Sequence, residues 1–282
     1  MSADGAGLIA PGHLFSQHSL ATFVRCPRRF LLKYVDRQPW PVPETNDPAE
    51  YEAHLLRGRI FHQWMVRHQM GLPMDRIAAC CPDPDLARWW QAAQRFPWHA
   101  LPSGLRVAEM PVVAQLGTFR LYARYDLVAL DPEGEAVVVD WKTLETRPHP
   151  RTLRERMQTR IYLYTLVALG DVLTGGAPVA PSQASMLYWF TNYPDEPATV
   201  RYSRDDYERD GATLTALAER IAGMPREEYL PSDDPLQCAR CNYRTLCNVA
   251  GADLAMGDAP QGWLDEELAY RLYLDEVPEL DN

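Results

Sequence analysis

Two aspartates and a lysine lie close together in the middle of this 282-residue chain. Asp126 lies in one hydrophobic run, and Asp140 and Lys142 end the next, whose residues 136–139 are continuously apolar as in a buried strand. Residues 131–134 between the runs predict a hairpin turn. Charges at the end of a buried strand are costly unless they are paired or bind a metal. The pattern therefore indicates a Mg²⁺ site for phosphodiester chemistry, with a strand-capping salt bridge as the alternative.

The lysine at position 142 is unusual for this chain. Lys33 and Lys142 are the only lysines among 28 Lys and Arg residues. A composition so biased toward arginine predicts arginine wherever only positive charge is needed. Lysine offers a compact ammonium group whose pKa shifts readily, which a guanidinium cannot imitate. The residue type therefore favours a chemical role for Lys142.

The spacing of these charges resembles a known family. Asp126, followed at a hairpin's length by Asp140-Trp141-Lys142, is similar to the paired motifs of the PD-(D/E)XK nuclease superfamily. Ala123 stands where that family usually has glycine, three residues before the first aspartate. The resemblance implies an α/β fold with a restriction-endonuclease-like core, a central mixed sheet flanked by helices. It also implies that Asp126 and Asp140 bind Mg²⁺ or Mn²⁺ and that Lys142 is catalytic.

A predicted helix before this segment carries a histidine. Gly58 and His62 are four residues apart and share a helix face, so we expect the missing side chain to clear space beside the imidazole. The string resembles the G-x-x-x-H motif of RecB-type nucleases, which implies that His62 joins the metal site; a surface histidine is the alternative. Glu109, in a predicted strand over residues 106–115, is expected to be a further catalytic residue, with an exposed strand position as the alternative.

A predicted helix over residues 152–170 follows the lysine. Its Gln158 and Tyr162 are four residues apart and resemble the Q-x-x-x-Y motif of RecB-type nucleases, which implies contact with nucleic acid near the metals. Three arginines of the same region are expected to contact phosphates, with a solvated basic face as the alternative. They are Arg151, Arg154 and Arg160.

Three cysteines lie near the end of the chain, Cys238, Cys241 and Cys247, in a C-x2-C-x5-C arrangement. In a cytoplasmic protein such spacing indicates metal binding rather than a disulfide. Three thiolates leave a tetrahedral site one ligand short, and Cys26 is the best candidate for the fourth ligand. Zn²⁺ and an iron–sulfur cluster both fit four cysteines, and the spacing does not decide between them.

The placement of the cysteines resembles that of iron–sulfur nucleases. One cysteine before the nuclease motifs, in a C-P-x-x-F-x-x-x-Y context at Cys26, and three after them are similar to AddB-type nuclease domains and CRISPR-adaptation nucleases. The resemblance implies a [4Fe-4S] cluster, with zinc as the alternative. Such a cluster would tie the N-terminal helix to the C-terminal segment rather than carry electrons.

The length permits one large domain with an ample core. We expect a single nuclease domain over residues 1–282. Its expected parts are an N-terminal helix with the first cluster ligand, a nuclease core, a C-terminal helix with the cluster-binding segment, and an acidic tail: residues 16–36, 51–203, 204–250 and 263–282.

The net charge of −10 argues against a simple nucleic-acid coat protein, but not against a nuclease with a locally basic surface. Acidic residues gather in residues 265–282, where seven stand against one arginine. No apolar run approaches the roughly 18 residues of a membrane span, and the start lacks the pattern of a secretory signal. We therefore expect a cytoplasmic location and no membrane contact.

Together these features predict a metal-dependent exonuclease that acts on single-stranded DNA ends in DNA repair, recombination or CRISPR adaptation. A protein partner such as a helicase or integrase would fit this function. Two alternatives remain: a non-catalytic nucleic-acid-binding partner in a helicase–nuclease complex, and a zinc-stapled structural protein.

Overall fold

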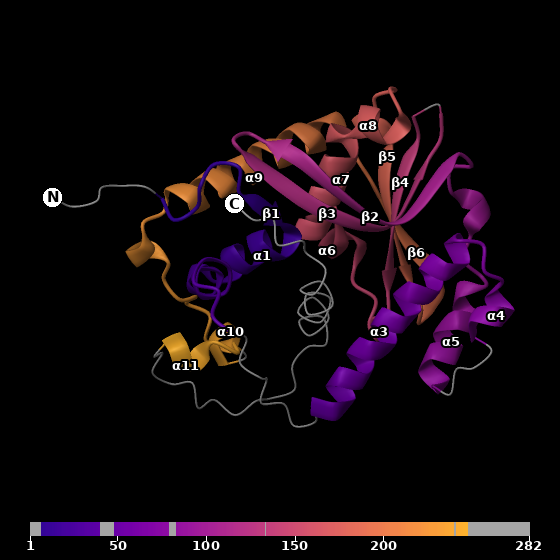
Figure 1. The fold of residues 1–282 in the computed structure, drawn as a ribbon, viewed down its shortest axis with the longest axis horizontal. Coiled ribbons are helices and arrows are strands. Elements are labelled where there is room, and N and C mark those ends of the chain that lie inside the picture. The colour runs from indigo at the N-terminus through magenta and orange to yellow at the C-terminus, as the bar shows by residue number, and fades with distance from the viewer. Residues whose placement is uncertain (1–6, 40–47, 79–82, 133, 240, 248–282) are drawn as a thin grey trace.

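The structure of the protein is a computed structural model that describes residues 7–39, 48–78, 83–132, 134–239 and 241–247. The described part forms a mixed six-stranded sheet with helices on both faces (Figure 1). This arrangement confirms the predicted α/β fold. The strands are β1 Leu14–Ser16, β2 Leu105–Leu116, β3 Phe119–Leu130, β4 Ala136–Lys142, β5 Ala184–Phe190 and β6 Tyr193–Arg201.

The helices connect these strands and cover the sheet. The longer ones are α1 Gln17–Arg25, α3 Pro48–Gln69, α5 Pro84–Ala93, α7 Met157–Ala168 and α9 Arg204–Gly223. The shorter ones are α2 Pro27–Phe30, α4 Met74–Ala78, α6 Pro150–Glu155, α8 Gly170–Thr174, α10 Pro235–Ala239 and α11 Arg244–Cys247. A π-helical turn, η1 Leu31–Val35, follows α2, and 3-10 turns occur at η2 Trp98–Ala100, η3 Pro181–Gln183 and η4 Arg226–Glu228. No helix within the described residues is long and apolar enough to cross a membrane.

The centre of the sheet is β3, which has different neighbours along its two edges. One edge pairs with β2 along its whole length. The other edge pairs in parallel with β1 at residues 120–122 and antiparallel with β4 at residues 127–130. The edge between these two pairings is therefore open at residues 123–126, beside the point where β3 and β4 part. Asp126 lies at this point.

The hairpin from β3 to β4 forms as the sequence predicts. Gly134 has a φ of 96°, in the left-handed region that glycine adopts without steric cost, and its N–H donates to the Asp131 carbonyl at 3.2 Å. The turn fixes the register of the two strands, which pairs Leu130 with Ala136 and Leu127 with Val139. The register then determines which polar side chains meet at the far end of β4.

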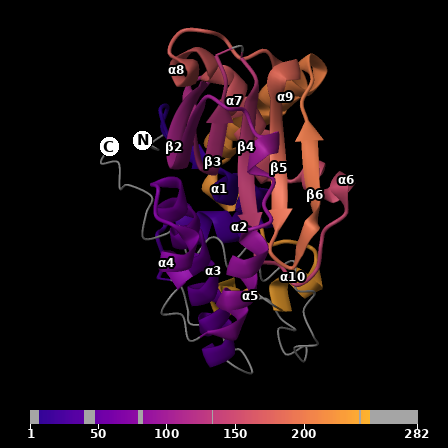
Figure 2. The same ribbon diagram turned by 90° about the vertical axis from the view of Figure 1, so that its right-hand side faces the viewer.

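Helices cover both faces of the sheet (Figures 1 and 2), and a hydrophobic core lies on each face. One lies under α1, α7 and α9 and contains Val128 and Val138 of the central strands. The other lies under α3 and α5, where Trp89 and Trp90 are buried against the sheet. Because side chains alternate along a strand, residues 126 and 140 belong to the face of α7.

The second core is rich in indole rings. It packs against the end of β4 on the face opposite the carboxylates. Trp141 and Trp189 contact each other edge to face with centroids 6.0 Å apart, and Phe96 packs against both. Trp141 lies between the two charged residues of β4 and points to the opposite face. Burial of these rings holds the end of β4 rigidly, since removing one buried aromatic side chain typically costs about 3–5 kcal/mol.

The structure differs from the predicted elements in three places. The expected helix over residues 152–170 is three helices, because Arg156 has extended backbone angles of −63° and 141°. The three-residue strand β1 is too short to show a sequence pattern. Helix α3 begins at Pro48, three residues before the expected start of the nuclease core at residue 51. The break at Arg156 turns α7 so that its first turn meets the end of β4.

Candidate active site

Three carboxylates lie in one row across the sheet. Glu109 of β2 lies opposite Asp126 of β3 in the antiparallel register. Asp140 of β4 lies one step beyond the last β3–β4 pair, Leu127 with Val139, and is therefore opposite Asp126 on its other side. Directly opposite residues in antiparallel strands point to the same face. The register thus places the backbones of three acids at neighbouring positions where β3 and β4 part.

The central carboxylate, Asp126, is held from two sides. It is 2 % exposed, and its Oδ2 accepts a hydrogen bond of 2.8 Å from the Trp141 backbone N–H. This hydrogen bond forms just beyond the last backbone pair of β3 and β4. Its Oδ1 lies 3.4 Å from Nδ1 of His62, which α3 carries to the site. His62 Nδ1 also lies 3.9 Å from Glu109 Oε1.

The ionisation of these groups reflects their crowding. Burial alone would lower the pKa of His62, but the charges of Asp126, Glu109 and Asp140 outweigh it and raise the pKa to about 9. Burial and the neighbouring Asp126 charge raise the pKa of Glu109. Burial also raises the pKa of Asp140, while the pKa of Asp126 is lowered because His62 and Lys142 outweigh its burial. Carboxylates so close together share protons unless a cation joins them.

Lys142 contacts the third carboxylate. Its Nζ lies 2.7 Å from Asp140 Oδ2 and donates a 3.1 Å hydrogen bond to Gln158 Oε1. Gln158 in turn donates through Nε2 to Asp140 Oδ1 at 2.6 Å. The Tyr188 ring, on β5 beside Asp140, has its centroid 5.8 Å from the ammonium. The amide therefore fixes the carboxylate and the ammonium relative to each other.

Tyr162 lies one turn after Gln158 on α7 and is buried. Its hydroxyl donates to the Arg124 carbonyl at 2.5 Å, and its ring packs edge to face against Tyr125 at 5.3 Å. The structure therefore brings Gln158 to the reacting groups and uses Tyr162 to hold α7 against β3. Tyr162 thus contacts residues of β3, and these contacts position the face of α7 that carries Gln158.

Glu109 has a φ of 51°, in the left-handed region that non-glycine residues rarely adopt. Such a backbone costs about 1–3 kcal/mol and persists where the surroundings enforce it. Here the carboxylate forms an ion pair of 2.6 Å with Arg124, which also lies on β3. Sequence reasoning missed Arg124, although its position two residues before Asp126 places it on the same strand face.

Among the described residues, the group of metal-ligand atoms lying within 4.8 Å of one another consists of His62, Glu109 and Asp126. The sequence prediction had placed Asp140 rather than Glu109 beside the other two. Both oxygens of Asp140 contact Lys142 and Gln158 instead. The site therefore offers an imidazole and three carboxylates, donors that suit Mg²⁺ and Mn²⁺.

The role expected for Gly58 is different in the structure. A Cβ at this position would lie 3.6 Å from Thr143 Oγ1, just after β4, which is an ordinary van der Waals distance. The glycine thus faces the strand end rather than the imidazole of His62. A methyl group would therefore fit at position 58, so the approach of α3 that brings His62 within reach of Asp126 does not require a glycine there.

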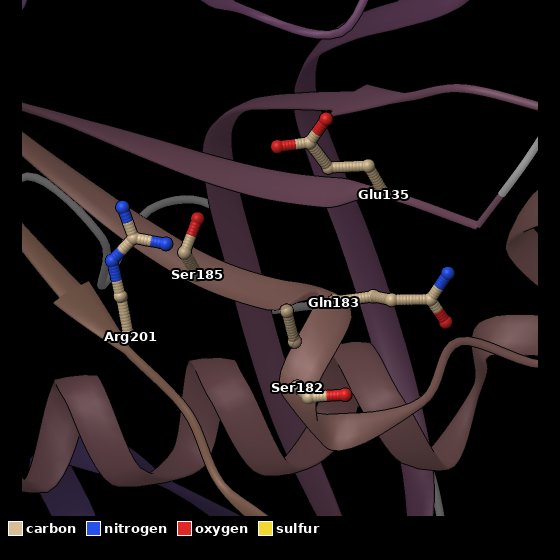
Figure 3. A pocket seen from close by; sticks show the side chains of 6 residues that line it. Glu135, Ser182, Gln183, Ser185 and Arg201 are labelled. Atoms are coloured by element: carbon tan, nitrogen blue, oxygen red, sulfur yellow. The ribbon is translucent and has the colours of Figure 1, made fainter.

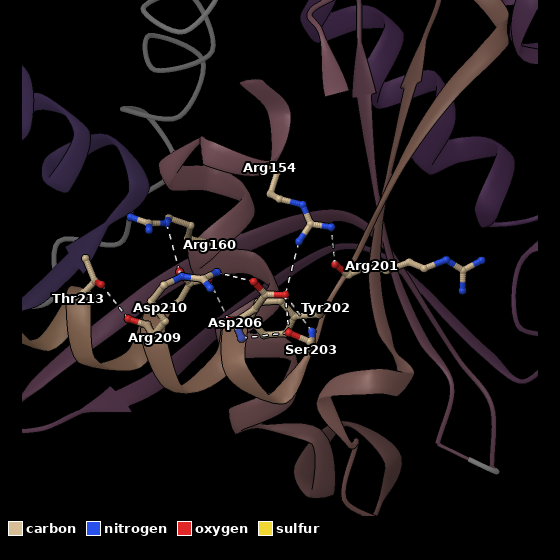
Figure 4. Close-up of polar contacts among 9 residues, drawn as sticks. All are labelled: Arg154, Arg160, Arg201, Tyr202, Ser203, Asp206, Arg209, Asp210 and Thr213. Atoms are coloured by element: carbon tan, nitrogen blue, oxygen red, sulfur yellow. Dashed lines mark hydrogen bonds and ion pairs between the residues drawn. The ribbon is translucent and has the colours of Figure 1, made fainter. Parts of the chain in front are cut away.

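The three arginines expected to contact phosphates all have carboxylate partners. Arg151 pairs with Glu155 at 3.0 Å on the surface of α6. The other two bind residues of α9, as Figure 4 shows: Arg154 with Asp206 at 3.4 Å and Arg160 with the buried Asp210 at 3.2 Å. A phosphate contact by any of them would have to replace one of these ion pairs.

The four cysteines expected to bind a cluster do not form a ready metal site: within the part of the chain that the structure describes, no three of their Sγ atoms lie within 4.8 Å of one another. Cys26, Cys238, Cys241 and Cys247 are all free thiols and half-buried. Burial, followed by Cys26 and Cys241, raises the pKa of Cys238, and burial, Cys241 and Cys26 raise the pKa of Cys247. Burial also raises the pKa of Cys241, against the nearby Arg29. We call these four thiols the cysteine group.

A hollow of ≈ 220 Å³ lies away from the carboxylates (Figure 3). It surrounds the first residues of β4 and β5, whereas Lys142 ends β4, and these two strands are parallel. The hollow is thus at the opposite end of the sheet from the site. Its lining residues are Glu135, Ser182, Gln183, Ala184, Ser185 and Arg201.

The family model of the PD-(D/E)XK nuclease superfamily matches residues 14–248. A comparison with curated protein sequences gives no match. Among solved structures, the protein SSO0001 is similar, with 16% sequence identity over 85% of this chain and 88% of that chain and a TM-score of 0.39. A protein of Eubacterium rectale named "Putative exonuclease" is similar at 10% identity over 88% of this chain and 91% of that chain, with a TM-score of 0.47.

Proposed function

We propose, because the chain belongs to the PD-(D/E)XK nuclease superfamily, that it is a metal-dependent exonuclease acting on single-stranded DNA ends. Family membership implies a metal-dependent phosphodiesterase with DNA as substrate. The observation that carries the proposal is the row of Glu109, Asp126 and Asp140 with Lys142 bound at its end. DNA repair, recombination or CRISPR adaptation would use such trimming, together with a helicase or integrase.

His62, Asp126 and Asp140 would hold Mg²⁺ or Mn²⁺, with Glu109 as a further ligand. Their imidazole and carboxylate donors fit either ion, and the mutual repulsion of the acids favours a cation between them. When bound, the ion would polarise a phosphate oxygen and lower the pKa of a water molecule. The ordered Asp126, with one oxygen fixed by the Trp141 N–H, presents the other toward His62.

The remaining polar residues would orient the reacting groups. Lys142 would stabilise negative charge that develops on the phosphate, because its ammonium is already fixed by Asp140 and Gln158. A donor that is fixed before the reaction needs no reorganisation during it. Arg124 would hold Glu109 in its strained position. In this proposal His62 and the carboxylates bind the metal, Lys142 stabilises charge, and Gln158 and Arg124 position these groups.

The cysteine group would hold a [4Fe-4S] cluster that joins the N-terminal helical segment to α10 and α11. Its support is that, besides burial, Cys26, from one end of the chain, raises the pKa of the three thiols near the other end, as Cys241 does for Cys238 and Cys247. A bound metal would displace the thiol protons, and its positive charge would offset the repulsion among the resulting thiolates. Zn²⁺ is the alternative occupant of the same four ligands.

Digestion of end-labelled DNA tests the nuclease proposal. With Mg²⁺ or Mn²⁺, we expect progressive shortening of single-stranded DNA from an end and slower loss of duplex DNA. Asp126→Asn and Asp140→Asn serve as matched controls, and both should be inactive. Circular single-stranded DNA cut as fast as linear DNA would contradict the exonuclease assignment, and a wild-type protein inactive on every substrate would favour the non-catalytic alternative.

Metal analysis of protein purified without oxygen tests the cluster. We expect a brown protein with broad visible absorbance and matching amounts of iron and sulfide. A colourless folded protein with stoichiometric zinc would replace the iron–sulfur proposal by the zinc alternative, without affecting the nuclease proposal.

A further inference from the structure

The segment of residues 143–149, between β4 and α6, is fixed to the hairpin that joins β5 and β6. Three consecutive residues of this hairpin each donate a hydrogen bond to a backbone carbonyl at or just after the end of β4. Helix α6, which follows the segment, also lies against β6 (Figure 2). The donors are Thr191, Asn192 and Tyr193, and the acceptors are the carbonyls of Lys142, Leu144 and Glu145, in that order, at 2.9, 2.8 and 2.8 Å.

Arg147 lies on this segment, and the hairpin also fixes its half-buried side chain. Its Nε donates to the Glu196 carbonyl at 2.9 Å, and its guanidinium lies over the Phe190 ring, with Cζ 5.8 Å from the ring centroid. These contacts use the inner nitrogen and one flat face of the group. The two outer nitrogens, Nη1 and Nη2, form no hydrogen bond or ion pair within the described part of the chain.

The Arg147 guanidinium lies close to the Lys142 ammonium. Phe190 is the partner of Lys142 in the parallel pairing of β4 with β5. The ring of Tyr188, two residues earlier on β5, has its centroid 5.8 Å from the ammonium. Residues two apart on a strand share a face and are about 6.6 Å apart along it. Two cations therefore lie over two successive rings of β5, and the guanidinium is one step nearer the end of that strand.

The surroundings of Arg147 differ from those of the arginines on α6 and α7. Arg151, Arg154 and Arg160 each have a carboxylate partner, which a phosphate would have to displace. The partners of Arg147 are a backbone carbonyl and an aromatic ring, and neither of them neutralises its charge. A phosphate can therefore approach its outer nitrogens without breaking an ion pair.

We propose that Arg147 binds the phosphate next to the scissile one in the strand whose end lies at the carboxylate row. The outer nitrogens of a guanidinium match two phosphate oxygens, so one side chain can hold the phosphate with two hydrogen bonds. A side chain that is already fixed loses little conformational freedom when it binds. The proposal rests on the proposed nuclease function and adds the contact that sets which linkage lies at the carboxylates.

Binding of a short end-labelled oligodeoxythymidylate to the whole chain, without added divalent metal, tests the proposal. We expect Arg147→Gln to weaken binding about tenfold at low salt and to reduce the slope of log K against log salt by about 0.7, the value for one lost phosphate contact with a single strand. Arg95→Gln is the matched control, because this exposed arginine pairs with Asp195 of the same hairpin at 3.3 Å. It should leave the slope unchanged.

A structural role for Arg147 needs its packing on Phe190, whereas a phosphate contact needs its charge. Arg147→Lys keeps the charge and should keep the wild-type slope. Arg147→Met keeps an unbranched side chain over the ring without the charge, and it should reproduce the reduced slope even if Arg147→Gln fails to fold. A wild-type slope in Arg147→Met would overturn the proposal.

Oligonucleotides with one uncharged methylphosphonate linkage, placed at successive positions from the end, locate the contact. We expect one linkage whose neutralisation weakens binding by the wild-type protein but has no further effect on Arg147→Met. Equal sensitivity of the two proteins at every linkage would overturn the contact, even in a protein that cleaves DNA. A linkage that depends on Arg147 in a protein that cleaves nothing would support the contact and contradict the nuclease proposal, so the two proposals fail separately.

Discussion

At the scale of single residues, side-chain chemistry matters more than net charge. Lys142 is a lysine in a chain that otherwise uses arginine, and its Nζ fits between the Asp140 carboxylate and the Gln158 amide. The five N–H donors of a guanidinium need more room and a flat set of acceptors. The three neighbouring carboxylates likewise leave little room, so a compact ammonium group fits beside them better than a guanidinium.

Lys142→Ala and Lys142→Arg should both lose at least about a hundredfold in cleavage rate, since each removes a fixed charge donor from the phosphate. Lys142→Arg keeps the charge and should bind single-stranded DNA as the wild type does. Rates come from end-labelled single strands and affinities from metal-free titration. Arg204→Lys, at an exposed pair with Glu208, is the control. Cleavage by Lys142→Arg within tenfold of the wild type would remove lysine from the mechanism.

Metal binding should depend on pH through His62. Its pKa is raised to about 9, so the metal-free protein carries a proton there at neutral pH, whereas a metal ligand must be neutral. Mn²⁺ affinity measured by calorimetry should therefore rise up to about tenfold per pH unit from about 7 to about 9, then level off. His62→Gln should lose most of this slope.

The same proton also affects stability. Because the folded pKa lies above the unfolded value of 6.5, the ion pair with Asp126 stabilises the metal-free fold fully below pH 6.5. That contribution is lost as the pH rises through about 9. A metal-free protein whose melting temperature and Mn²⁺ affinity are both flat over this range would show that His62 is neutral throughout.

At the scale of elements, the sequence predicts what local periodicity and turn chemistry control. The hairpin turn, the continuous burial of β4 and the four-residue spacing of Gln158 and Tyr162 all appear in the structure. The hairpin's length is what places Asp126 opposite Asp140. The role of His62 came from a family resemblance, since nothing in α3 itself indicates which strand it meets.

What the sequence could not predict depends on non-local contacts. Strand β1 has three residues and gains its identity only by pairing in parallel with β3, more than 100 residues away. That pairing decides where α1 lies, and so how α1 packs against α7. The break at Arg156 is also tertiary, because residues 152–170 have helical propensity throughout.

The contact between α7 and α9 allows a test of whether buried polar contacts hold α9 in the fold. Asp210 is 3 % exposed and binds Arg160 and the Tyr202 hydroxyl, which donates at 3.1 Å. Asp210→Ala leaves both partners without their acceptor and should destabilise the fold by about 3 kcal/mol in denaturant unfolding. The exposed pair variant Glu208→Ala should cost under about 0.5 kcal/mol. Equal effects of the two substitutions would mean that α9 is held by its apolar face alone.

At the scale of the whole molecule, the segment that follows α1 contacts the segment that follows α9. Cys26 directly follows α1, and its thiol accepts from the Arg29 N–H at 3.4 Å, while the other three thiols lie beyond α9. Two direct contacts join these segments: the Arg28 N–H donates to the Leu230 carbonyl, and Arg226 pairs with Asp36 at 2.6 Å. The N-terminal segment therefore contacts the C-terminal segment even before a metal is considered.

Cys26→Ser should remove the closure that a cluster at the cysteine group would provide. By analogy with disulfide loops, joining residues more than 200 apart contributes about 5 kcal/mol, comparable to the net stability of a domain. We expect Cys26→Ser to lose the cluster and to melt about 10 °C lower or more. Cys80→Ser removes a thiol outside the cysteine group and should change neither property. A Cys26→Ser protein with full iron content and an unchanged melting temperature would assign the fourth ligand to another residue.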